Sequence, residues 1–384
     1  MSSRPLVLAT SALFVVSLGY GVIVPILPEL AGGRDATDEG LLSAVYAGYA
    51  AAKIAMQIPG GVWVDRAGAE RIARLALALF TVSLAGFLLP VGLVGFTVVR
   101  ALEGAATGLA YPAAFALAAR GPAEGAGKRL GLVAGLGTSG LLAGPALAGA
   151  LAEISPRLPV AIATGVGALV TLALFALPSA PRSEPAPDAP RTAKDAYVRL
   201  GRLALDVGFL LLMLPIAFNK LTFSAFQGLL PLAGPDLHGL ETTGVTALFA
   251  LTGVVFGASQ PLGGWLSDRF APRGVVLVAS VPLLAALLAL AYVPDATGFF
   301  VAYGSYVAAS SIVFAATTKH AATSFGTNDT FGGLFGLLST LTDVATIVGP
   351  LLFLNLYASS AAGVFVWMAA IGVPCALAYA FVRR

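Results

Sequence analysis

Long apolar runs recur along the whole chain, and each is close to the length that a helix needs to cross a bilayer, about 20 residues. The chain has 384 residues, of which 58% are hydrophobic and only 11% are charged, and its mean hydropathy is +0.90. So many apolar side chains cannot all be buried in a water-soluble core, and most of them must face lipid. The sequence therefore predicts an all-α, multi-pass integral membrane protein.

The charged and metal-binding residue types exclude several other classes of protein. The formal net charge of +3 is too small and too dispersed to form a nucleic-acid-binding face. The one cysteine, Cys375, has no partner for a disulfide, and the two histidines, His238 and His320, are far apart in sequence. We therefore expect no enzymatic catalysis, no metal site, no cofactor and no nucleic-acid partner.

Twelve apolar runs lie between charges or clusters of glycine and proline. They cover residues 5–28, 41–62, 72–90, 93–119, 129–153, 158–178, 205–231, 241–266, 274–293, 297–319, 330–356 and 361–382. Basic residues accumulate on the cytoplasmic side of membranes. With the N-terminus in the cytoplasm, 17 of the 22 Lys and Arg residues fall on that side, two fall outside and three lie within spans. This predicts a protein of the inner (plasma) membrane with both termini in the cytoplasm.

A polar stretch at residues 179–204 divides the chain into an N-terminal six-helix bundle (1–178) and a C-terminal one (205–384). The prolines and charges of this stretch oppose both a membrane helix and a packed core, so we expect a cytoplasmic linker.

The two halves repeat each other. Asp65 and Asp268, each near the end of the second span of its half, are 203 residues apart. Gly-Pro pairs begin at Gly144 and Gly349, 205 residues apart. Parallel repeats around a central cavity are typical of secondary transporters, which alternate access by rocking one half against the other.

Several motifs accompany this repeat. The loop after the second span carries Gly61, Asp65, Arg66, Gly68 and Arg71, and the loop after the eighth span carries Gly264, Asp268, Arg269 and Arg273. The fifth span carries Gly140, Gly144, Pro145 and Gly149. The fourth span reads FTVVRALEGAATG, and the first contains Leu18-Gly19 followed by Pro25 and Pro28.

In this order the motifs resemble those of the major facilitator superfamily, and within it the twelve-helix drug:proton antiporter family, which includes the vesicular monoamine transporters. The resemblance covers essentially the whole chain. It implies two pseudo-symmetric six-helix bundles, proton-coupled export of a small molecule, and a cytoplasmic latch at Asp65. A charged turn that only fixes topology is the alternative for Asp65. Close helix packing is the alternative reading of the glycines in the fifth span.

Ionisable side chains within the spans are costly in lipid, so they should face the cavity or pair with each other. They are Lys53, Arg100, Glu103, Lys220 and Asp343. Lys53 and Asp343 lie near the midplane in opposite halves, and the resemblance to the vesicular transporters implies an ion pair between them. The alternative is two cavity residues that never meet.

Arg100 and Glu103 are three residues apart and share one helix face, so Glu103 is either a structural counter-ion or a proton carrier. Lys220, with Asn219 and Gln227 in the same span, either binds substrate or extends to the membrane interface. The predicted spans contain three basic residues and two acidic ones. Because a buried cation needs an anionic partner, this balance favours a neutral or anionic substrate.

The sequence thus favours a proton-coupled exporter of a small amphipathic compound. We expect it to act as a monomer in the bilayer, with the substrate and protons as its partners. Two rival functions remain. One is import of an organic anion or sugar, and the other is a non-transporting sensor or lipid-handling role.

Overall fold

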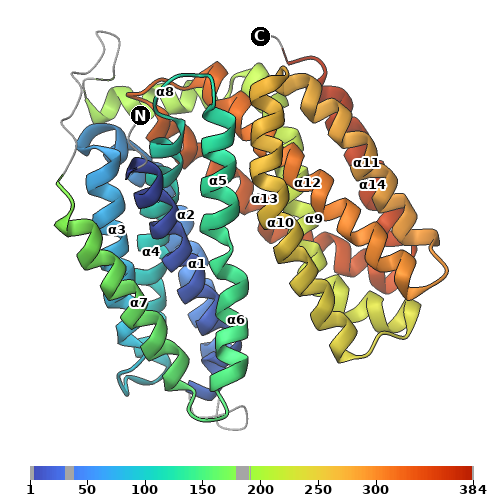
Figure 1. The fold of residues 1–384 in the computed structure, drawn as a ribbon, viewed down its shortest axis with the longest axis horizontal. Coiled ribbons are helices and arrows are strands. Elements are labelled where there is room, and N and C mark those ends of the chain that lie inside the picture. The colour runs from blue at the N-terminus through green and yellow to red at the C-terminus, as the bar shows by residue number, and fades with distance from the viewer. Residues whose placement is uncertain (1–3, 31–38, 179–189, 191, 383–384) are drawn as a thin grey trace. The chain divides into compact units, whose positions relative to one another are not determined.

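The computed structural model describes residues 4–30, 39–178, 190 and 192–382, which form helices with no β-strand among them (Figure 1). The helices are α1 (Arg4–Leu30), α2 (Glu39–Ala67), α3 (Ala69–Gly86), α4 (Gly92–Ala119), α5 (Ala126–Thr138), α6 (Gly140–Leu151), α7 (Arg157–Ala176), α8 (Ala193–Ala204), α9 (Val207–His238), α10 (Thr242–Arg269), α11 (Pro272–Tyr292), α12 (Ala296–Phe325), α13 (Phe331–Ser359) and α14 (Gly363–Tyr379).

Each predicted span coincides with a helix or, for residues 129–153, with the consecutive pair α5 and α6. In the described part of the chain, ten spans are long and apolar enough to cross a membrane. The remaining two are α3, of 18 residues with charges in its first turns, and α14, an apolar helix of 17 residues. The all-helical, twelve-span prediction is confirmed.

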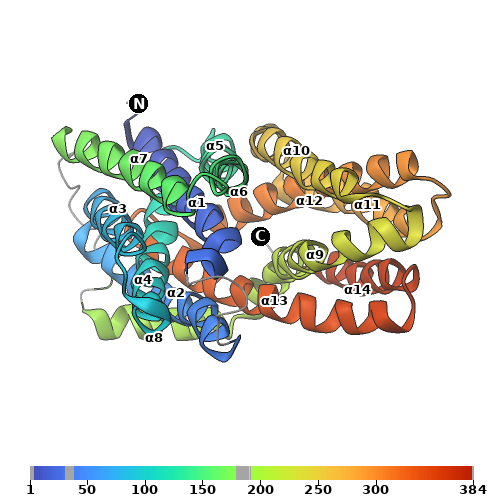
Figure 2. The ribbon, with the colours of Figure 1, turned by 90° about the horizontal axis from the view of Figure 1, so that it is seen from below.

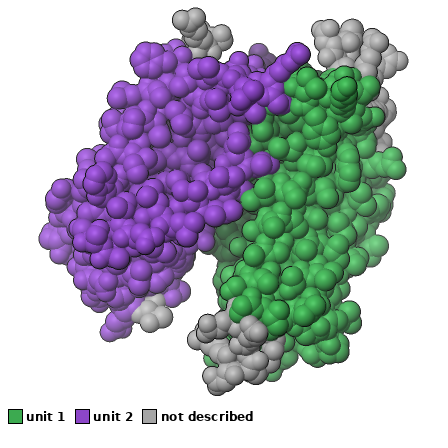
Figure 3. Space-filling model, turned by 180° about the vertical axis from the view of Figure 1, so that it is seen from behind, with its two compact units in different colours: residues 1–120, 136–200, 327–339 green, residues 121–135, 201–326, 340–384 purple. Residues whose placement is uncertain are grey.

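The chain forms two compact units that exchange short segments (Figure 3). Unit 1 contains residues 1–120, 136–200 and 327–339, and unit 2 contains residues 121–135, 201–326 and 340–384. Each unit therefore includes a segment from the other half of the sequence. Unit 1 contains the start of α13, and unit 2 contains most of α5. The division into bundles 1–178 and 205–384 remains a prediction from the repeat.

Several helix ends follow from local side-chain chemistry. Asp206 and Asp295 cap α9 and α12, because their carboxylates accept hydrogen bonds from Phe209 N (2.8 Å) and Gly298 N (2.7 Å). Gly68, with φ at +96°, makes the sharp turn between α2 and α3 that a residue with a Cβ rarely adopts. Asp65 thus lies in the last turn of α2, three residues before the turn to α3.

Both units combine close backbone contacts at small residues with aromatic packing between helices. In unit 1 small residues let α2 and α4 touch: a Cβ on Gly104 would overlap the carbonyl oxygen of Tyr49. In unit 2 aromatic rings fill the space between helices, and the Phe226 ring lies 4.6 Å from that of Tyr306 and 5.9 Å from that of Phe365. Small-residue contacts bring backbones together, and with them the polar groups that those backbones carry.

The linker differs from its prediction in one respect. Residues 193–204 form α8, which buries Ala196 and Leu200 on one face. The prolines that oppose a helix all precede residue 191, whereas Ala196 and Leu200 are four residues apart and share a face. Residues 179–189 and 191 of the predicted linker lie outside the described residues, as do Arg34, Arg383 and Arg384.

A reciprocal pair of hydrogen bonds begins α8. Thr192 Oγ1 accepts from Asp195 N (3.1 Å), and Asp195 Oδ2 accepts from Thr192 N (3.0 Å). These bonds from the Thr192 side chain and backbone hold the pKa of Asp195 below its usual value. Their support for the helix is therefore complete above the ordinary pKa of an aspartate. It is lost as the pH falls through the lowered pKa of Asp195.

Thr192→Ala should loosen the start of α8. Loss of an N-cap of this kind typically costs about 1 kcal/mol, so the first amides of α8 should exchange with deuterium roughly fivefold faster. Hydrogen exchange of peptides covering residues 192–204 measures this. Thr192→Ser keeps the hydroxyl and should exchange like the wild type, and equal rates for all three proteins would contradict the cap.

Candidate functional site

Asp65, in the last turn of α2, binds the start of α13. Its Oδ1 and Oδ2 accept hydrogen bonds from Gly332 N and Gly333 N, each at 2.7 Å. The first N–H groups of a helix have no partner within the helix, and the helix dipole favours an anion there. Arg120 and Arg199 also interact electrostatically with the carboxylate. We call the contact of Asp65 with Gly332 and Gly333 the first clasp.

Glycines make the first clasp possible. A Cβ on Gly61 would overlap the carbonyl oxygen of Gly332, and one on Gly336 would overlap that of Gln57. The backbones of α2 and α13 therefore touch over more than one turn. Gly61, which the motif places in a loop, lies within α2 and serves this close approach.

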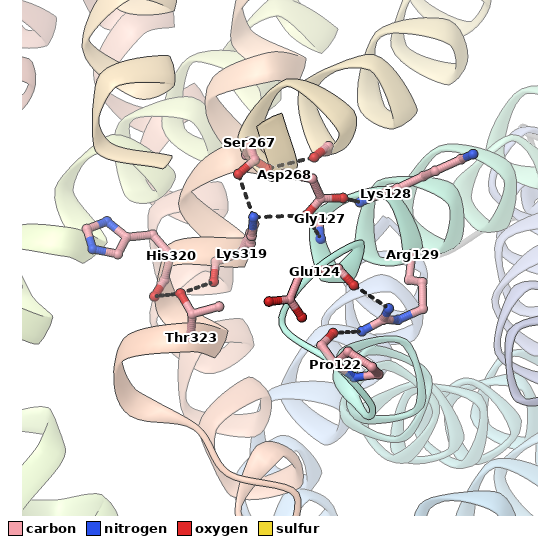
Figure 4. A network of polar contacts seen from close by, with 11 residues as sticks. Pro122, Glu124, Gly127, Lys128, Arg129, Ser267, Asp268, Lys319, His320 and Thr323 are labelled. Atoms are coloured by element: carbon pink, nitrogen blue, oxygen red, sulfur yellow. Dashed lines mark hydrogen bonds and ion pairs between the residues drawn. The ribbon is translucent and has the colours of Figure 1, made fainter. Parts of the chain in front are cut away.

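Asp268 makes the equivalent contact in unit 2 (Figure 4). Its Oδ1 and Oδ2 accept hydrogen bonds from Gly127 N and Lys128 N, each at 2.8 Å, at the start of α5. A Cβ on Gly264 would overlap the carbonyl oxygen of Gly127, as at the first clasp. We call the contact of Asp268 with Gly127 and Lys128 the second clasp.

The second clasp also contains an ammonium group. Lys319 Nζ lies 2.9 Å from Asp268 Oδ1 and donates a hydrogen bond to the carbonyl oxygen of Ser267. The sequence suggests that Lys319 ends a span and faces the cytoplasm, but α12 continues to Phe325 and the Lys319 side chain is only 9% exposed. Sequence reasoning missed this residue, because nothing in the local pattern distinguishes a lysine at a helix end from one buried against a carboxylate.

Three of the four arginines of the two loop motifs are exposed, whereas Arg273 is part-buried and donates a hydrogen bond to the carbonyl oxygen of Ala380. Arg66, Arg71 and Arg269 are exposed, and the Arg269 guanidinium lies 5.9 Å from the centre of the Trp265 ring. Neighbouring positions in each motif thus have different environments: the carboxylates bind helix ends, and these cations face outward.

Arg100 and Glu103 form a fully buried ion pair in unit 1. Arg100 Nη1 lies 2.6 Å from Glu103 Oε2, and neither residue is exposed. The guanidinium also lies against two tyrosine rings, 5.1 Å from the centre of Tyr20 and 4.7 Å from that of Tyr49. Among the described residues none donates a hydrogen bond to Glu103 Oε1. One oxygen of the Glu103 carboxylate, Oε2, therefore accepts a hydrogen bond from Arg100, whereas Oε1 accepts none from the described residues.

The remaining ionisable residues of the spans have aromatic neighbours. Lys53 Nζ is 5.2 Å from the Tyr111 ring centre, and Lys220 Nζ is 4.9 Å from that of Phe314. Both lysines are half-buried, as is Asp343. The pairing of Lys53 with Asp343 stays a prediction.

The two amide side chains predicted in the same span as Lys220, those of Asn219 and Gln227, have different environments. Asn219 is buried and donates to Ser310 O (2.8 Å) and Ser310 Oγ (2.6 Å), so it joins α9 to α12. Gln227 is exposed. Asn219 therefore has a structural partner already, whereas Gln227 lies at the surface.

The glycine motif of the fifth span lies on α6, in contact with α1. A Cβ on Gly140 would overlap the carbonyl oxygen of Phe14, and one on Gly144 would lie 2.6 Å from that of Leu18. Gly149 has open space around its Cα. The helix continues through Pro145 and is interrupted earlier, at Ser139, whose hydroxyl donates to Leu136 O (2.7 Å). Gly140 and Gly144 thus serve close packing here.

Comparisons with known proteins agree with this architecture. The Quinolone resistance protein NorA of Staphylococcus aureus is 31% identical over 163 residues, which are 41% of this chain and 40% of NorA. The probable nitrate/nitrite transporter NarK2 of Mycobacterium tuberculosis is 34% identical over 139 residues, 35% of this chain and 33% of NarK2. The chain thus aligns with less than half the length of these relatives.

Solved structures share the fold over nearly the whole chain. FucP in the outward conformation matches with a TM-score of 0.79 and 17% identity, covering 100% of both chains. The human organic anion transporter MFSD10 matches with a TM-score of 0.80 and 18% identity, covering 98% of this chain and 99% of MFSD10. The sequence model of the Major Facilitator Superfamily matches residues 9–350. The chain belongs to the Major Facilitator Superfamily of membrane transporters.

Proposed function

We propose that this transporter couples the export of a small amphipathic compound to the entry of protons, and that both clasps face the cytoplasm. The partial similarity to NorA, a quinolone resistance protein, supports export. The excess of Lys and Arg on one side of the predicted spans supports the orientation. The observation that carries the mechanism is the pair of equivalent clasps.

Each clasp joins the two halves of the sequence. Asp65 lies before the linker and Gly332 after it, whereas Asp268 lies after the linker and Gly127 before it. Rocking of the halves would therefore have to release both carboxylates from both helix starts. A few charge-assisted hydrogen bonds give a contact strong enough to favour one state and weak enough to break, since each contributes about 1.5–3 kcal/mol.

Proton coupling requires a group whose proton affinity changes between states. Glu103 is suited to this, because it is buried beside Arg100 and its proton affinity would change with the hydration of the cavity. Asp343, paired with Lys53 as the sequence predicts, is the second candidate for the proton carrier. Each pair would couple the opening of the cavity to protonation.

Flux measurements in proteoliposomes test this proposal. Purified protein is reconstituted with an imposed pH gradient, and quinolones and other amphipathic compounds are supplied one at a time. Export predicts that protons moving in one direction drive a compound in the other. Accumulation of a compound in the same direction as protons would instead show import, and saturable binding without flux would show a sensor.

Import of an anion is the second candidate, because two half-buried lysines, Lys53 and Lys220, lie in the spans. The partial similarity to NarK2, a probable nitrate/nitrite transporter, points the same way. A substrate carboxylate or other anion could bind the ammonium group of Lys220, which lies near the middle of α9.

Lys220→Gln should then weaken binding of anionic compounds by roughly 10- to 100-fold and affect neutral compounds less. Titration calorimetry with the anionic and neutral compounds identified in the flux screen measures both affinities. Lys220→Arg keeps the charge and should retain most of the anion affinity. Equal losses for anionic and neutral compounds would show that Lys220 supports folding or gating.

A further inference from the structure

Helix α8 has an exposed face on which cations and apolar side chains alternate. Lys194, Val198 and Arg202 are four residues apart and form one stripe. Val198 is 45% exposed and the adjacent Tyr197 is 43% exposed. The opposite face, with Ala196 and Leu200, packs on the protein.

The charge of this exposed face is effectively positive. The helix contains Lys194, Arg199 and Arg202 but only one acid, Asp195. The Asp195 carboxylate accepts hydrogen bonds from both the Thr192 backbone and the Thr192 hydroxyl at the helix start. These bonds hold the Asp195 side chain at the helix start, and the cations of α8 outnumber its one acid.

The buried face of α8 supports the first clasp. A Cβ on Gly333 would lie 3.2 Å from Leu200 Cδ2, so the Leu200 side chain covers Gly333. Gly333 N is one of the two donors to Asp65. Arg199, next to Leu200, interacts electrostatically with the Asp65 carboxylate. A force that holds α8 in place therefore also holds the groups that surround Asp65.

The position of α8 suits a membrane surface. Its residues 193–200 belong to unit 1, run across the ends of the helices of that unit (Figure 1) and lie at their edge, beside α2 and α4 (Figure 2). Cations close to a bilayer surface are attracted by anionic lipids, and exposed aromatic and apolar side chains beside them enter the headgroup region favourably. The ends of membrane-spanning helices are where lipid headgroups are found.

We propose that α8 binds the headgroups of anionic phospholipids through Lys194 and Arg202, while Tyr197 and Val198 enter the interface, and that this contact stabilises the closed first clasp. The assignment of this end to the cytoplasmic leaflet rests on the proposed orientation. Lipid binding itself does not depend on which compound is transported.

A fluorescent reporter on α8 tests the binding. Gly201 has open space around its Cα, so Gly201→Cys in a Cys375→Ala background can carry an environment-sensitive fluorophore. The protein is reconstituted in phosphatidylcholine alone or with phosphatidylglycerol. We expect a blue-shifted emission and lower quenching by aqueous acrylamide when phosphatidylglycerol is present. Lys194→Gln with Arg202→Gln should remove most of the difference.

Arg157→Gln is the matched control, because Arg157 is an exposed cation at the start of α7, at the other end of unit 1. It should leave the fluorescence response unchanged. If each cation of α8 contributes the usual attraction to an anionic surface, the double variant should need roughly 10- to 30-fold more phosphatidylglycerol for the same shift.

The outcomes separate this proposal from the proposed function. The fluorescence response needs no transport, so it can be positive even if no compound is exported. Equal emission in both lipid mixtures, or a shift that persists in the double variant, would overturn anionic lipid binding. A shift seen only in native membranes would indicate a protein partner instead and would also overturn it.

Discussion

Glu103→Gln should abolish proton-driven transport and cost less stability than loss of the whole side chain. Glutamine is close to glutamate in size and can still accept a hydrogen bond from Arg100, but it cannot exchange a proton. We expect substrate to exchange across the membrane without a pH gradient, and the gradient to lose its effect. Counterflow and gradient-driven flux of the same compound in proteoliposomes measure the two activities separately.

Two further variants show which role Glu103 has. Glu103→Ala leaves the buried Arg100 without its counter-ion, which should destabilise the protein by about 3–5 kcal/mol. A transporter that needs Glu103 only for folding would lose stability in Glu103→Ala and keep proton coupling in Glu103→Gln. Asp343→Asn is the matched test of the other candidate, and loss of coupling there alone would assign the proton to Asp343.

Asp65→Asn should open the first clasp. The amide keeps one acceptor oxygen for Gly332 and Gly333, and its NH₂ group faces the other backbone donor. Loss of one hydrogen bond to a charged acceptor is worth about 1.5–3 kcal/mol, which corresponds to a shift of roughly 10- to 150-fold toward the open state.

Spin labels on exposed residues at the two sides of the contact measure this shift. Ala67 and Asn328 are exposed and lie beside the first clasp, and Glu124 and Phe270 are exposed and lie beside the second. The distance from residue 67 to residue 328 should lengthen in Asp65→Asn, and Asp65→Glu should restore part of the short population. Distances that stay the same in folded protein would leave the motif with a topological role only.

The comparison of both label pairs also tests whether the clasps act together. If the halves rock as rigid bodies, Asp65→Asn should increase the open population at residues 124 and 270 as well. If only the first pair responds, the two contacts open independently, and the model of a single rocking motion is wrong.

The spans and the repeat could be predicted from the sequence because they depend on local properties. A run of apolar residues must be buried in lipid wherever its neighbours lie, so its length and its flanking charges identify a membrane helix. The structure of the linker could not be predicted in this way. Composition describes residues 179–204 as polar, but the period of Ala196 and Leu200 within them produces a helix with a buried face.

The partners of the polar residues depend on the tertiary structure. The motif indicated that Asp65 and Asp268 occupy equivalent positions in the two halves. The backbone N–H groups that bind Asp65 lie 267 and 268 residues away in the chain, and those that bind Asp268 lie 141 and 140 residues away. The same is true of Lys319, which meets Asp268 only because α12 and α10 pack together. By itself, the sequence determined how many helices cross the membrane and how they repeat. The sequence also placed Arg100 and Glu103 on one helix face, because residues three apart in a helix are neighbours. Only the tertiary structure decided the partners of Asp65, Asp268 and Lys319, because these contacts require the close approach of backbones that are distant in the chain.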